Sequence, residues 1–78
     1  MSRPERLSRR YFVRGREVSQ REALNDWLRH AAADGMTGSS ARRTFETAED
    51  HNARPGEVAQ ARGALDAKGV VITGAEGL

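Results

Sequence analysis

The stretch that decides the fold is residues 11–22, which read YFVRGREVSQRE. It opens with aromatic and β-branched residues, which favour a strand, and a second short β run follows the pair Arg14-Gly15. Two β runs joined by a two-residue link that contains glycine predict a β-hairpin. Ser19 and Glu22 have the spacing of a capping box, in which the serine oxygen accepts from a helix N–H. The stretch therefore predicts a hairpin that leads directly into a helix.

The first predicted helix begins at Ser19 and ends at Gly35, because glycine tolerates the left-handed conformation that closes a helix. Its apolar residues recur with helical spacing, at Leu24, Trp27, Leu28 and Ala31. The polar residues of this segment, Asp26 and His30 among them, fall off that stripe. Trp27 is the only tryptophan, and its place on the stripe predicts the centre of the core.

A second helix is predicted to start at Ser39 or Ser40, because either side chain can cap it. Asn52 is its expected end, since asparagine tolerates a left-handed conformation. The apolar face of this helix is thin and consists of Ala41, Phe45 and Ala48.

Pro55 opens a third predicted helix, which ends at Gly69. Its apolar stripe is Val58, Ala61 and Leu65. Residues 70–73 form the strongest β run in the chain and can pair with the hairpin. The expected architecture is therefore a small single α+β domain with the order β-β-α-α-α-β, namely an N-terminal β-hairpin, three helices and a C-terminal strand. Residues 1–8 are expected to be a flexible basic arm, and residues 9–78 the domain.

The composition leaves no room for a second domain or a deep active-site cleft. The chain has 78 residues, 37 % of them hydrophobic, and 12 of the hydrophobic residues are alanine. A chain of this size buries only about 60 to 65 % of its unfolded surface. Because cysteine is absent, disulfides and thiolate chemistry are excluded. No apolar run is long enough for a membrane span or a signal peptide, so we expect a cytoplasmic protein.

No pattern in the sequence points to catalysis, a metal or a cofactor. His30 and His51 lack the spacing of a metal site. Ser39 and Ser40 have no Gly-x-Ser-x-Gly elbow around them, and helix capping accounts for both. We therefore expect neither an enzyme nor a bound cofactor or metal.

Arginine is concentrated at one end of the chain. Only Lys68 among 13 basic residues is a lysine. Residues 1–43 carry ten arginines against five acids, whereas residues 44–78 carry three basic residues against six acids. Such clustering favours a polyanion or an acidic protein surface as the partner. The predicted binding surface lies on the hairpin and consists of Arg9, Arg10, Tyr11, Arg14 and Arg16.

Tyr11 and Phe12 are neighbours on a predicted strand, so they must face opposite sides of the sheet. The sequence leaves open which of the two is exposed. An exposed aromatic ring among arginines suits a nucleic acid, because bases stack on the ring while arginines hold phosphates. A protein interface is enriched in the same two residue types.

A second candidate surface lies further along the chain. Residues 44–73 have the order of a short helix, a tight turn, a longer helix ending in glycine and a β run. The segment resembles the winged helix-turn-helix domains of GntR-type bacterial repressors. On the pattern of that family Ala48 falls at the contact between the helices, Asn52 at the turn and Val58 at a buried position. Thr47 and His51 depart from the pattern, because they stand where the family has apolar residues. The resemblance implies that a second helix reads the DNA major groove through Arg54, Gln60 and Arg62. An ordinary amphipathic helix that closes on a strand has the same pattern.

The sequence therefore predicts a small non-catalytic regulator or inhibitor that binds a protein of a nucleic-acid-handling machine through its arginine-rich N-terminal surface. In size, charge asymmetry and lack of cysteine the chain is similar in type to phage and mobile-element accessory proteins, CRISPR inhibitors among them. The alternative is a nucleic-acid-binding transcriptional regulator of the winged-helix kind, whose partner is DNA or RNA. A third interpretation is a homodimer that pairs through an exposed strand edge.

Overall fold

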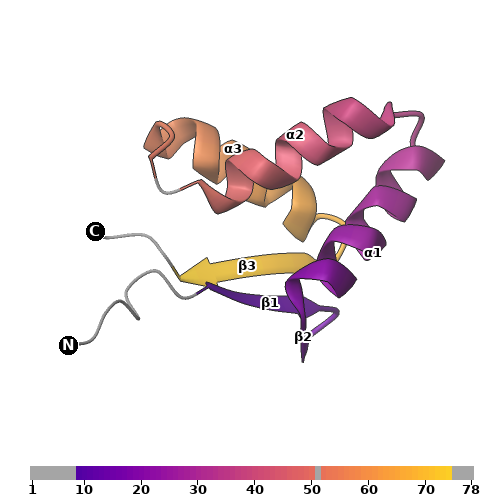
Figure 1. Ribbon diagram of the computed structural model, residues 1–78, viewed down its shortest axis with the longest axis horizontal. Coiled ribbons are helices and arrows are strands. Elements are labelled where there is room, and N and C mark those ends of the chain that lie inside the picture. Colours follow the sequence, from indigo (N-terminus) through magenta and orange to yellow (C-terminus); the bar gives the residue numbers. More distant parts are fainter. Residues whose placement is uncertain (1–8, 51, 75–78) are drawn as a thin grey trace.

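The hairpin, the three helices and the final strand expected from the sequence are all present in a computed structural model, which describes residues 9–50 and 52–74 (Figure 1). The elements in chain order are β1 (Arg9–Val13), β2 (Arg16–Val18), α1 (Gln20–Ala33), α2 (Gly38–Glu49), α3 (Pro55–Asp66) and β3 (Val70–Gly74). The strands form one antiparallel sheet in the order β2-β1-β3, and the helices lie on one side of it (Figure 1). The predicted α+β class and element order are confirmed. The predicted flexible arm lies outside the described residues.

The hairpin turn is a two-residue turn in which both residues have positive φ, 49° at Arg14 and 85° at Gly15. These signs match the primed turns whose twist suits a hairpin, where asparagine followed by glycine is the usual pair. Arginine is an uncommon occupant of this left-handed region, at a cost of about 1 kcal/mol. The backbone N–H of Arg14 donates to the carbonyl of Gly69 at 2.7 Å, which continues the pairing of β1 with β3.

Both ends of α1 form as the local sequence predicts. The Ser19 hydroxyl accepts from the Glu22 N–H at 3.1 Å. At the other end Gly35 has φ +90°, and the N–H of Met36 after it donates to the carbonyl of Ala31 at 2.9 Å. This bond, which spans the last helical turn, is the mark of a Schellman motif.

The start of α2 differs from the prediction. Its cap is Thr37, whose hydroxyl accepts from the Ser40 N–H at 3.2 Å, and the helix begins at Gly38. Ser39 and Ser40 are therefore inside the helix rather than at its cap. Threonine caps almost as well as serine, so residue type does not distinguish Thr37 from the two predicted serines.

The end of α2 also differs, because the helix stops at Glu49 and not at Asn52. Two arginines from other elements satisfy its last carbonyl groups. Arg9 Nε donates to the carbonyl of Glu49 at 2.8 Å, and Arg62 Nε donates to the preceding carbonyl at the same distance. Cationic donors at a helix C-terminus also complement its negative dipole end.

The core lies between the sheet and the helices. It consists of twelve buried side chains: Tyr11, Val13, Ala23, Trp27, Ala31, Ala41, Phe45, Ala48, Ala61, Leu65, Val70 and Ile72. Trp27 is buried at the centre, as predicted, and its indole N–H donates to the carbonyl of Ala41 at 2.8 Å. The ring of Tyr11 stacks on that of Phe45 with centroids 6.2 Å apart. In the described residues, no helix is long and apolar enough to cross a membrane.

Asp26 is the one described charged residue in the core, with 3 % of its surface exposed. The helical spacing places it off the apolar stripe, so its burial corrects the prediction. Leu24 and Leu28, which the spacing places on that stripe, are only half-buried. The buried face of α1 thus includes Ala23 and Asp26. The Asp26 carboxylate can be buried because Arg14 of the hairpin and Arg29 of α1 pair with it.

The free edge of β3 is covered. Because the Arg14 N–H bonds to Gly69, the alternation of an antiparallel ladder directs the backbone groups of Val70 and Ile72 away from β1. Val70 is 0 % and Ile72 5 % exposed. At the end of this edge, Arg62 donates to the carbonyl of Gly74 at 3.2 Å. This edge therefore offers little free backbone for pairing with a second chain.

Candidate functional site: the outer face of the sheet

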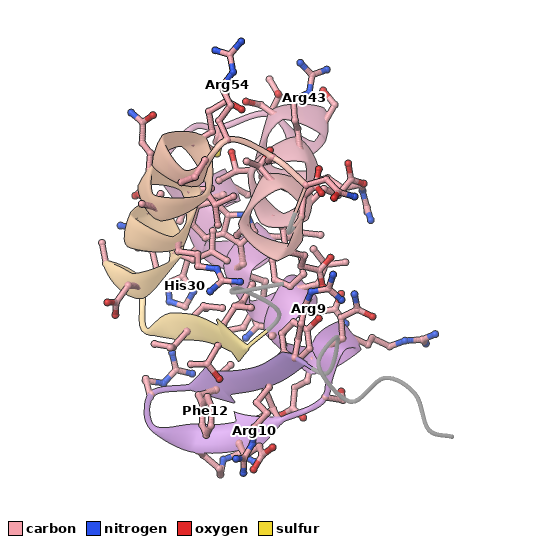
Figure 2. All side chains as sticks on the ribbon, turned by 90° about the vertical axis from the view of Figure 1, so that its left-hand side faces the viewer. Arg9, Arg10, Phe12, His30, Arg43 and Arg54 are labelled. Atoms are coloured by element: carbon pink, nitrogen blue, oxygen red, sulfur yellow. The ribbon has the colours of Figure 1, made fainter. Side chains whose placement is uncertain are left out.

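The side of the sheet that faces away from the helices carries its own set of side chains. Along β1, Tyr11 and Val13 are buried toward the helices, so Arg10 and Phe12 point the other way (Figure 2). Cross-strand partners share a face, and the register adds the partners of these two residues. We call this surface the outer face, and its residues are Arg10, Phe12, Glu17, Val71 and Thr73.

Phe12 is the centre of the outer face. It lies between Glu17 on β2 and Val71 on β3, and both Phe12 and Val71 are half-buried. The guanidinium carbon of Arg10 is 6.0 Å from the centroid of the Phe12 ring. An arginine at this distance from an aromatic face makes a cation–π contact. The apolar ring is thus held at the surface under a charged side chain.

Arg10 and Glu17 form a two-pronged ion pair across the hairpin. Arg10 Nη2 lies 3.1 Å from Glu17 Oε1, and Arg10 Nε lies 3.2 Å from Oε2. Hydrogen bonding to Arg10 lowers the pKa of Glu17, and the same bond raises the pKa of Arg10. Both groups are exposed, so the pair contributes little to stability and chiefly fixes the direction of the Arg10 side chain.

Tyr11, which the sequence grouped with the arginines, is in the core with 8 % of its surface exposed. Its hydroxyl donates to Glu49 Oε2 at 2.5 Å, and the Gln20 amide donates to the same oxygen. Burial, and then the hydrogen bond to Glu49, raises the pKa of Tyr11 to about 12. The aromatic residue of the pair that lies at the surface is therefore the half-buried Phe12, which the surface predicted from the sequence did not include.

Each arginine of the predicted hairpin surface has an acceptor within the chain. Arg9 donates to a backbone carbonyl of α2, and Arg10 pairs with Glu17. Arg14 Nη2 lies 3.5 Å from Asp26 Oδ1, and Arg16 Nη2 lies 3.4 Å from Glu22 Oε2. The sequence places the arginines together, whereas the fold brings an acid to three of them. The hairpin is thus a surface of mixed charge.

The second predicted surface is divided by the fold. Arg54 is the exposed N-cap of α3, and Gln60 is exposed beside the α2–α3 groove. Arg62 instead is half-buried and donates to the carbonyls of Ala48 and Gly74. Of the three residues that the winged-helix resemblance assigns to DNA, two are therefore available at the surface and one is engaged inside the fold.

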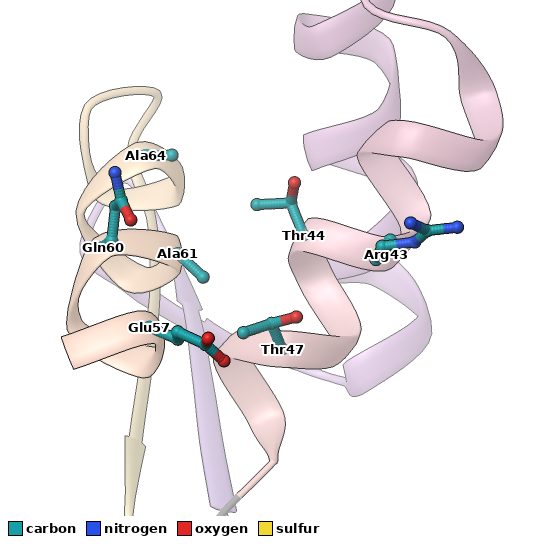
Figure 3. Close-up of a pocket in the computed structure, with 7 residues that line it drawn as sticks. All are labelled: Arg43, Thr44, Thr47, Glu57, Gln60, Ala61 and Ala64. Atoms are coloured by element: carbon teal, nitrogen blue, oxygen red, sulfur yellow. The ribbon is translucent and has the colours of Figure 1, made fainter. Parts of the chain in front are cut away.

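A shallow groove of about 340 Å³ separates α2 from α3 (Figure 3). Thr44 and Thr47 of α2 face Ala61 of α3 across it, and Glu57 lies at one end. The small side chains leave the helices incompletely packed here. Within residues 9–50 and 52–74, no group of three or more acidic or histidine side chains is arranged to hold a metal ion. No protein-family model, curated protein or solved structure matches the chain.

Proposed function

We propose that this protein is a small non-catalytic regulator or inhibitor that docks through the outer face of its sheet onto a larger protein. Its partner belongs to a nucleic-acid-handling machine, as for phage and mobile-element accessory proteins such as CRISPR inhibitors. The observation that carries the proposal is the half-buried Phe12 under Arg10, on a sheet face that none of the described helices covers. Aromatic residues and arginine are both enriched at protein interfaces, and interface hot spots are enriched in arginine.

The ion pair of the outer face favours a protein over a nucleic acid there. A phosphate backbone is bound by cations that are free to replace its counterions. Arg10 is paired with Glu17, so binding a phosphate through Arg10 would leave a carboxylate beside the polyanion. A protein surface can meet both signs of charge, because the ion pair can exchange partners with the rim of an interface.

The experiment captures partners from lysate of the native host, after nuclease treatment, with three forms of the chain. Phe12→Thr removes the ring and keeps a residue that favours strands. The matched control is Met36→Thr, which changes the exposed methionine in the connection between α1 and α2. Wild type and Met36→Thr should capture the same protein in equal amounts. Phe12→Thr should capture about one tenth of that amount or less, as expected when a hot-spot anchor is removed.

Two outcomes would contradict the proposal. One is equal recovery of the protein by all three forms, which would remove the outer face from the interface. The other is a wild-type capture that vanishes with nuclease, which would assign the binding to a nucleic acid. Circular dichroism of Phe12→Thr and Met36→Thr ensures that both variants are folded before the comparison.

A second candidate function is nucleic-acid binding through the helical side of the molecule. Arg43 and Arg54 point away from the sheet, and neither makes an ion pair with another described residue (Figure 2). Gln60 is exposed on the same pair of helices. Binding to random duplex DNA across a salt series tests this function, because each phosphate contact adds about 0.9 to the salt slope. Absence of binding at low salt would end this alternative.

A further inference from the structure

A second hollow, of about 260 Å³, lies between the hairpin turn and α1. Three arginines from three elements border it: Arg14 from the turn, Arg16 from β2 and Arg29 from α1. Two acids, Glu22 and Asp26, also contribute to its lining, together with Asn25. None of these residues belongs to the outer face.

Asp26 organises two of the arginines. Its side chain is 5 % exposed, and one of its oxygens, Oδ1, lies 2.8 Å from Arg29 Nη2 and 3.5 Å from Arg14 Nη2. The two arginine side chains are 71 % and 62 % exposed. One buried oxygen therefore holds two guanidinium groups close together while most of their N–H donors face solvent. Each guanidinium has five such donors in a fixed fork.

One feature of this arrangement is unfavourable and would be relieved by an anion. Two positive groups that share one carboxylate oxygen repel each other, and a negative ligand between their solvent-facing donors would reduce that repulsion. Arg14 is also held in the left-handed backbone conformation of the turn, and strained residues of this kind cluster at binding sites.

We propose that this hollow binds one phosphoryl group, as a phosphate monoester or free phosphate. Arginine forks match the oxygens of phosphate bidentately, and three of them border the hollow. A monoester dianion carries about two negative charges and three terminal oxygens, whereas a carboxylate or a phosphodiester carries one charge. The hollow is smaller than the usual range of ligand pockets, so it suits the phosphoryl group and not the molecule that bears it.

Glu22 is the residue that opposes the anion. It pairs with Arg16 at 3.4 Å, and this pair must open for Arg16 to reach a ligand. Removing its charge with Glu22→Gln should therefore strengthen phosphate binding by about two- to fivefold, the range expected for an exposed ion pair. A gain of affinity from removal of one negative charge is not produced by damage to the fold.

The experiment titrates the full ¹⁵N-labelled chain with inorganic phosphate at constant ionic strength and follows the arginine Nε–H signals by NMR. We expect the signals of Arg14, Arg16 and Arg29 to move together, with a dissociation constant on the order of 1 mM. Arg29→Lys keeps the charge but lacks the fork, so it should weaken binding by about tenfold. The matched control Arg10→Lys changes an arginine outside the hollow and should leave the affinity unchanged.

Further titrations separate the sources of the phosphoryl group. Phosphoserine should shift the same three signals as inorganic phosphate, and a short oligonucleotide without terminal phosphates should not. The proposal is overturned if chloride at equal ionic strength moves the signals as far, if Arg10→Lys weakens binding as much as Arg29→Lys, or if only the oligonucleotide binds. Because Phe12 lies on the other surface, Phe12→Thr should bind phosphate normally, which separates this test from that of the proposed function.

Discussion

Arg62 on α3 donates its Nε–H to the carbonyl oxygen of Ala48 at 2.8 Å and so ties the end of α2 to the third helix. A second bond, from Arg62 Nη2 to the carbonyl of Gly74 at 3.2 Å, adds the last strand. One half-buried side chain thus connects three elements that the sequence separates widely. Arg9 donates to the neighbouring carbonyl of Glu49. The two arginines thus end α2, whereas a glycine, Gly35, ends α1.

We therefore expect Arg62→Ala to destabilise the protein by about 1.5 to 3 kcal/mol, the range for hydrogen bonds to a charged group. The cost arises because two carbonyls lose their donors and the aliphatic stem no longer packs. Urea unfolding, followed by the fluorescence of the single tryptophan, measures it. Arg54→Ala is the matched control, since Arg54 is exposed and makes no side-chain cap contact, and should change stability by less than about 0.5 kcal/mol. Equal effects would refute the bridging role.

Tyr11 is the only tyrosine, so its ionisation can be read directly from absorbance near the tyrosinate band. We expect a midpoint of about 12 in the folded protein, against the ordinary value of 10.0, because burial disfavours the charged form and the hydrogen bond to Glu49 holds the proton. Glu49→Gln removes the neighbouring charge and should lower the midpoint, but not to the ordinary value, because burial is the larger cause. A midpoint at the ordinary value in the wild type would show that Tyr11 is exposed.

The same shift makes stability depend on pH at the alkaline end. Above pH 10 the unfolded chain loses the Tyr11 proton while the folded chain keeps it, so the folded state binds more protons and stability falls as pH rises from about 10 to 12. Over that window the loss should be about 1 to 3 kcal/mol. Tyr11→Phe should show a smaller decline in denaturation curves between pH 9 and 11. Parallel curves for the two proteins would contradict the linkage.

The sequence predicted those features of the fold that depend on neighbouring residues. Ser19 with Glu22, and Gly35 at the other end, fix α1 within a few residues of each end, so local spacing was sufficient. The end of α2 could not be predicted, because it depends on Arg9 and Arg62, which come from other elements. Local patterns do not contain that information.

In the candidate site, too, features that depend on neighbouring residues could be predicted, and features that depend on other elements could not. Alternation along a strand predicted that Tyr11 and Phe12 face opposite sides, but which side is covered depends on how the helices pack on the sheet. Phe12 gains its neighbour Val71 only through the register of β1 with β3. The burial of Asp26 likewise depends on the turn residue Arg14, which lies twelve positions earlier. Tertiary packing therefore determines which of the two aromatic residues lies at the surface and why Asp26 is buried.

Arg14 allows a test that separates the needs of the fold from those of the proposed phosphoryl site. Its φ of 49° suits asparagine better than arginine, and asparagine before glycine is the preferred pair for this turn. Arg14→Asn should therefore gain up to about 1 kcal/mol from the turn. It also loses an ion pair with Asp26, but that pair is long, its arginine is 62 % exposed, and Arg29 remains on the carboxylate. We expect equal or higher stability in urea unfolding.

The same variant should bind inorganic phosphate about tenfold more weakly, since one of the three guanidinium forks is gone. Arg16→Asn is the comparison, because Arg16 also borders the hollow but lies in a strand, where asparagine is unfavourable. It should lose both affinity and stability. If Arg14→Asn instead unfolds more easily by over about 1 kcal/mol, the arginine serves the fold by neutralising the buried acid, and the left-handed turn is the cost of that neutralisation. Higher stability with lost affinity would show that the strain at Arg14 is retained for binding.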